Sequence, residues 1–80
     1  SGRLRVYVND KESSLYRGMR VRHALTLEQV RLVESGKAEV RDSRGHMIGL
    51  DGALSDGQDL LFAEHKIENQ QIFNGGAGGI

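Results

Sequence analysis

The 80-residue sequence contains no cysteine, which excludes a disulfide, a thiolate metal site and a thiol nucleophile. No apolar run approaches the roughly 18 residues that a membrane-spanning helix needs, and no signal-peptide core is present. The formal net charge is zero, which argues against a dedicated nucleic-acid binder. We therefore expect one small, soluble, cytoplasmic domain that depends on regular secondary structure and an economical core.

Charge is distributed unevenly along the chain. Residues 1–31 carry seven basic and three acidic side chains, whereas residues 32–80 carry four basic and eight acidic ones. Such an asymmetry is consistent with a charged face for a partner, and equally with a chance distribution of solvated charges. Arg17, Arg20 and Arg22 are the candidate partner-binding residues of the basic half.

The first part of the chain has the pattern of a β-hairpin. Leu4, Val6 and Val8 alternate with Arg5 and Tyr7, which predicts a strand with one buried face. A polar, turn-prone segment follows at 9–12, and 14–17 is expected to return as a short strand that Gly18 ends.

Apolar periodicity then changes to that of a helix. Thr26 and Gln29 have the spacing of a capping box, and Leu27, Val30 and Val33 recur at helical spacing on what we expect to be the buried face. Gly36 is suited to a left-handed C-terminal cap. The pattern predicts a helix at about 27–35, preceded by a short separate turn at 20–25.

Strand patterns return in the second half. Residues 38–41 alternate, 42–45 form a turn, and 46–50 are expected to return as the second strand of a hairpin. A final strand is predicted at 58–63. The resulting order, β-β-α-β-β-β, predicts a two-layer α+β domain with two hairpins and a crossover helix packed on a mixed sheet of four to five strands. The expected core comprises Leu4, Val6, Val8, Leu15, Val21, Leu25, Val30, Val33, Val40, Ile48, Leu54, Leu60 and Phe62.

The C-terminal residues lack this periodicity. We expect an ordered domain at 3–67 and a flexible, glycine-rich tail at 68–80, because glycine loses much entropy on ordering. The apolar pair Ile72 and Phe73 either docks on the domain or serves as an exposed recognition element. The first two residues are interpreted as the remnant of a removed tag.

The order of these motifs resembles the ubiquitin-like β-grasp superfamily, and within it the sulfur-carrier and protein-modifier types. The resemblance covers roughly residues 3–66 and includes the opening hairpin, the Val-x-x-Ala-Leu segment at 21–25 and the tail with Gly78 and Gly79. The Leu-x-Asp-Gly-x-x-Leu segment at 54–60 is similar to the turn before the last strand in the small subunit of molybdopterin synthase and the thiamine-pathway sulfur carrier.

This resemblance implies a non-enzymatic protein without a cofactor, whose terminal diglycine is adenylated by an activating enzyme. The product becomes a thiocarboxylate or an isopeptide bond to another protein. Here Ile80 follows Gly79, so a tail-processing peptidase would have to remove it first. The segment after the last strand is also longer than in sulfur carriers. We expect a monomer.

The histidines and the clustered aspartates do not form a recognisable metal site in the sequence. His23, His46 and His65 lack metal-ligand spacing and are expected at the surface, so no metal site is predicted. Neighbouring aspartates at 51–59 are explained by turn chemistry.

Two alternative functions stay open. Residues 33–40 together with 54–58 faintly resemble the αL RNA-binding motif, although no aromatic-rich strand is present for base stacking. The chain is otherwise interpreted as a plain adaptor domain that docks through a sheet edge or an arginine-rich face.

Overall fold

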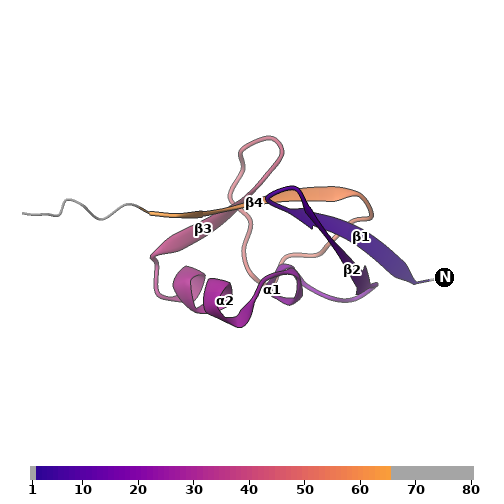
Figure 1. Ribbon diagram of the computed structural model, residues 1–80, viewed down its shortest axis with the longest axis horizontal. Helices are drawn as coiled ribbons and strands as arrows, with labels where there is room; N and C mark the ends of the chain where they lie inside the picture. The colour runs from indigo at the N-terminus through magenta and orange to yellow at the C-terminus, as the bar shows by residue number, and fades with distance from the viewer. Residues whose placement is uncertain (1, 66–80) are drawn as a thin grey trace, which may run out of the picture.

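The computed structural model describes residues 2–65 (Figure 1). Its elements, in chain order, are β1 (Arg3–Val8), β2 (Lys11–Tyr16), α1 (Val21–Ala24), α2 (Leu27–Glu34), β3 (Ala38–Asp42) and β4 (Gln58–Glu64). Both helices lie on one side of the sheet (Figure 1). The arrangement is a small two-layer α+β fold, as the sequence predicts.

A two-residue turn joins β1 to β2. Asn9 and Asp10 both have positive φ, 51° and 69°, which is the backbone conformation of a type I′ turn. Asparagine and aspartate tolerate this region better than other non-glycine residues. The turn fixes the antiparallel register, from Val8 opposite Lys11 to Arg3 opposite Tyr16. The predicted opening hairpin is therefore confirmed.

The four strands form one mixed sheet in the order β2-β1-β4-β3. The last strand, β4, occupies the interior, where it runs parallel to β1 and antiparallel to β3. The connection from β2 to β3 passes through α1 and α2 on one face of the sheet (Figure 1). Alternation along each strand then directs one set of side chains towards the helices and the other set away from them.

The capping box of α2 is present as predicted. The Thr26 hydroxyl accepts from the Gln29 N–H at 3.1 Å, and the Gln29 side chain accepts from the Thr26 N–H at 2.9 Å. The helix ends one residue before the predicted limit. Leu27 is 66% exposed, so its expected place on the buried face is wrong. Contact with the core is made by Val30 and Val33, whereas the first turn lies outside it.

The predicted return strand at 46–50 is also wrong. Only one bridge, between Met47 and Arg41, extends the pairing of β3, and the Ile48 N–H donates to the Val40 carbonyl at 2.8 Å. Beyond this point the backbone is bonded to α1 instead: the carbonyls of Leu50 and Gly52 accept from the first two N–H groups of that helix, at 2.8 and 3.1 Å. The chain is thereby drawn away from β3, and the sheet has four strands.

Within residues 2–65 nine apolar side chains form the buried core. Eight of them belong to the predicted set, and the other five predicted residues pack against the core while partly buried. Ala38 is the buried residue that the sequence pattern missed. Within residues 2–65 no polar or charged side chain is fully buried. Neither helix in this part has the length and apolar character that crossing a membrane would require.

Candidate functional site

The face of the sheet opposite the two helices is covered by neither of them (Figure 1). We call it the open face. Strand alternation and register place on it the following side chains: Arg3, Arg5 and Tyr7 from β1, Glu12, Ser14 and Tyr16 from β2, Asp59, Leu61 and Ala63 from β4, and Glu39 and Arg41 from β3. The open face thus combines arginine and tyrosine, which are enriched at protein interfaces, with glutamate, aspartate, serine and alanine, which are depleted there.

Two exposed apolar side chains lie on either side of Arg41. Leu61 is paired with Arg41 across β3 and β4, and Met47 is paired with it on the opposite side. Leu61 is 53% exposed and Met47 is 66% exposed. Sequence alternation gave one signal for this patch, because Leu61 follows a buried leucine within β4. No signal marked Met47, whose place depends on the short bridge to β3.

Side-chain and backbone contacts hold His65, the residue after β4, against β3 and the turn before it. Glu39 pairs with Arg41, and its other carboxylate oxygen lies 3.1 Å from His65 Nε2. His65 Nδ1 lies 3.1 Å from the Gly36 carbonyl oxygen, and the His65 N–H donates to the Lys37 carbonyl at 2.8 Å. The hydrogen bond from Arg41, followed by that from His65, lowers the pKa of Glu39. The position of His65, the last described residue, is therefore fixed by several contacts.

The predicted arginines differ in their surroundings. Arg22 donates from Nε to Asp51 at 3.0 Å and lies 3.6 Å from Glu34, so it connects α1 to α2 and to the 49–53 loop. These contacts, chiefly the hydrogen bond with Asp51, raise the pKa of Arg22. Arg17 and Arg20 are exposed and make no ion pair within residues 2–65. The structure thus distinguishes one structural arginine from two that face solvent.

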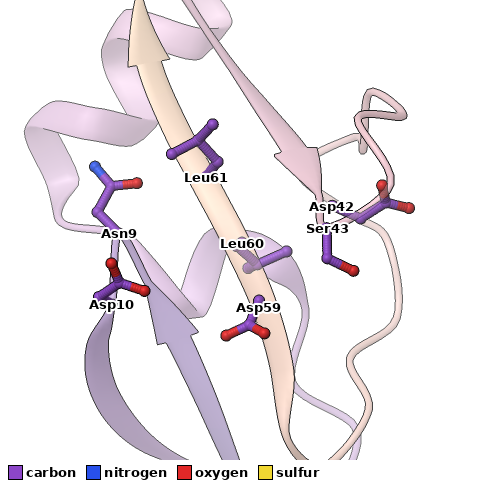
Figure 2. Close-up of a pocket in the computed structure, with 7 residues that line it drawn as sticks. All are labelled: Asn9, Asp10, Asp42, Ser43, Asp59, Leu60 and Leu61. Atoms are coloured by element: carbon purple, nitrogen blue, oxygen red, sulfur yellow. The ribbon is translucent and has the colours of Figure 1, made fainter.

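Figure 2 shows a shallow hollow beside the β1–β2 turn. Its volume is about 140 Å³, well below the roughly 300 Å³ of a small ligand pocket. The lining residues are Asn9, Asp10, Asp42, Ser43, Asp59, Leu60 and Leu61. One carboxylate oxygen of Asp42 accepts from the backbone N–H groups of Arg44 and His46, each at 2.9 Å. The hydrogen bond from the His46 N–H contributes most to lowering the pKa of Asp42. This carboxylate serves the turn after β3.

The three histidines are exposed, as expected, and each has a local partner. His23 Nδ1 accepts from the Arg20 N–H at 2.8 Å and so caps the start of α1. His46 Nδ1 lies 3.8 Å from Asp42, and His65 contacts Glu39. In the described part of the chain no three histidine or carboxylate side chains gather as metal ligands would.

The remaining predicted site residues, Ile72, Phe73, Gly78, Gly79 and Ile80, lie outside the described residues. No protein-family model matches the sequence, and no curated protein is significantly similar to it.

Proposed function

We propose that this chain is a ubiquitin-like β-grasp protein that acts by being recognised and that carries a C-terminal diglycine for activation by a partner enzyme. The observation that carries the proposal is the order β2-β1-β4-β3, with a helical crossover and with the last strand parallel to the first. A ubiquitin-like β-grasp domain has this hairpin, crossover and central final strand. The Met47–Arg41 bridge occupies the place at which a fifth strand would extend the sheet.

The central position of β4 supports a presented tail. Because β4 is held between β1 and β3, the residues that follow His65 start from a fixed point on the body. A partner enzyme that binds the body could therefore locate the terminal backbone in its own active site. Glycine at 78 and 79 would allow close backbone approach, since no side chain obstructs the channel.

The proposed chemistry belongs to the terminal carboxylate. After a peptidase removes Ile80, the Gly79 carboxylate attacks the α-phosphorus of ATP, and pyrophosphate leaves to give an acyl-adenylate. A sulfur or amine nucleophile of a partner then displaces AMP. The small protein contributes the carboxylate and the recognised surface, and the activating enzyme contributes the catalytic groups.

Mass spectrometry with a candidate activating enzyme and ATP tests this proposal. The chain ending at Gly79 is expected to form an acyl-adenylate or thioester, whereas the chain ending at Ile80 is not. Gly79→Val should abolish adduct formation by obstructing the active-site channel. Gly75→Val is the matched control, because it places the same side chain earlier in the tail, and it should retain activity. Equal behaviour of the chains ending at Gly79 and Ile80 would contradict the proposal.

A plain adaptor is the second candidate, and the exposed Leu61 and Met47 on the open face favour it. An adaptor would bind its partner through the body alone. Removal of residues 75–80 would then leave partner binding unchanged, whereas a modifier would lose its activity. Leu61→Asp would weaken binding in both cases, so the tail deletion is the measurement that separates them.

A further inference from the structure

Four exposed arginines belong to β1 and to the segment between β2 and α1. Arg3 and Arg5 lie on β1, Arg17 directly follows β2, and Arg20 directly precedes α1, where its Nη1 donates to the Asp51 carbonyl at 3.5 Å. The Arg17 N–H donates to the Gly2 carbonyl at 2.7 Å, which holds this segment against the start of β1. We call these four arginines the basic end.

The arginine side chains of the basic end are not engaged in ion pairs within residues 2–65. In the described part of the chain none of its arginines makes a salt bridge, whereas Arg22 and Arg41 both do. Nearby like charges repel one another, and an oppositely charged partner would relieve this repulsion. The acidic residues of the other end, Glu39 and Glu64, lie at the opposite limit of the sheet, since Glu64 ends β4.

The Arg3 side chain is positioned by contacts with two residues of β2. Its guanidinium lies 5.3 Å from the centre of the Tyr16 ring and donates to the Ser14 hydroxyl at 2.8 Å and to the Tyr16 hydroxyl at 3.4 Å. A side chain that is ordered before binding loses less conformational entropy when a partner arrives. Tyr16 is 53% exposed and so offers apolar surface beside the charge.

Acidic residues border the basic end and limit its extent. Glu12 lies on β2 four pairs away from Tyr16 and Arg3 and two pairs away from Arg5, and Asp56 accepts from the Arg5 N–H at 2.9 Å. A nucleic-acid backbone that continued past the arginines would approach these carboxylates and be repelled. A short segment with a few carboxylates fits the available area, and arginine binds carboxylates with two parallel hydrogen bonds.

We propose that the basic end binds a short acidic segment of a partner protein. The proposal deepens the function proposed above and rests on it for the identity of the partner as a protein. The proposed contact uses only residues 3–20, so binding at the basic end and activation of Gly79 can fail independently.

Fluorescence anisotropy with the full chain tests the proposal. The probe is a labelled peptide of alternating glutamate and glycine, with glutamine replacing glutamate in the neutral control. The variant Arg5→Glu, Arg17→Glu, Arg20→Glu leaves the Arg3–Tyr16 stack intact and should weaken binding of the acidic peptide at least about tenfold. The matched variant Arg31→Glu, Arg44→Glu changes arginines that are exposed and unpaired in the described part but lie elsewhere, and it should bind as wild type.

The other outcomes overturn the proposal. Equal loss in both variants, or loss in neither, would show that the position of the arginines is immaterial. Tighter binding of a uridine oligonucleotide of the same charge would favour RNA, and its affinity should then fall steeply between about 50 and 200 mM salt. Salt-sensitive self-association of the protein alone would favour a head-to-tail contact between copies. Because reversal of three charges can affect folding, Arg5→Gln, Arg17→Gln, Arg20→Gln is measured beside it, with circular dichroism of each variant, and should also weaken binding.

Discussion

The side-chain amide of Asn9 pairs with both backbone groups of Phe62. Its Nδ2 donates to the Phe62 carbonyl at 3.1 Å, and its Oδ1 accepts from the Phe62 N–H at 2.8 Å. The Asn9 N–H also donates to the Leu60 carbonyl at 3.0 Å. Because the backbone turns away from β4 at Asn9, the Asn9 side chain makes the hydrogen bonds to β4 that the backbone of β1 no longer makes.

Substitution at this position should therefore weaken the domain. Asn9→Ala removes both amide hydrogen bonds and leaves a β-carbon at positive φ, so we expect a loss of about 2–4 kcal/mol in the free energy of unfolding, measured by urea titration. Asn9→Gly keeps the turn conformation and removes only the amide. A glycine variant as stable as wild type would show that the pairing with Phe62 contributes nothing.

Gly52 is expected to accommodate a side chain only if its neighbours shift. A β-carbon there would lie 3.1 Å from Ile48 Cγ2 and 3.2 Å from the Gly49 carbonyl oxygen, beside the start of α1. Gly52→Ala should destabilise the protein by about 1–3 kcal/mol through this crowding. Gly49→Ala is the matched control, because its β-carbon meets nothing within 4 Å. Thermal unfolding of both variants makes the comparison, and equal midpoints would contradict the close approach at Gly52.

The capping box of α2 should behave as a coupled pair. Thr26→Ala removes an acceptor for the Gln29 N–H and should cost about 1 kcal/mol. Gln29→Ala removes the reciprocal acceptor. A double-mutant cycle on urea denaturation should give a non-zero coupling energy, because each side chain holds the geometry that the other uses. Strict additivity of the two losses would mean that the two bonds form independently.

Acid should destabilise the protein through Glu39 and Asp42. Both carboxyl groups have a pKa lowered by folding, Glu39 chiefly through Arg41 and Asp42 chiefly through the His46 N–H. A depressed pKa means that the unfolded chain binds protons first, so this stabilisation is complete above the ordinary pKa of about 4 and is lost as the pH falls through the folded value. Glu39→Gln and Asp42→Asn should flatten this acid limb in urea titrations between pH 2 and pH 6. Glu28→Gln, on the exposed side of α2, is the control. If the variant that carries both Glu39→Gln and Asp42→Asn loses stability at acid pH as the wild type does, these two carboxyl groups do not cause the loss.

Local patterns predicted most of the elements because their causes are local. Thr26 and Gln29 start α2, and the polar pair at 9–10 reverses the first hairpin. Contacts between distant segments account for what was missed. The return strand expected at 46–50 does not form because Leu50 and Gly52 bond to α1.

The candidate sites have the same dependence on distant contacts. Arg22 pairs with Asp51, 29 residues away, whereas Arg3 and Arg5 lie beside the end of β2 only through the pairing of β1 with β2. Likewise, Asn9 and Phe62 are 53 positions apart in the sequence, so hydrophobic periodicity does not predict their pairing. Composition indicated a basic half of the chain, and the sheet register was needed to place its arginines at one end.

The interior position of β4 also determines when the domain can fold. As the chain emerges from the ribosome, the β1–β2 hairpin and the α2–β3 segment appear first, yet no described strand pairing joins them until residues 58–64 arrive and insert between β1 and β3. Most of the sheet's stabilising contacts therefore close late, across a long stretch of sequence, as in folds of high contact order. A chain interrupted before β4 would lack every strand pairing between the β1–β2 hairpin and β3, and the apolar residues that face β4 in the complete sheet would stay exposed.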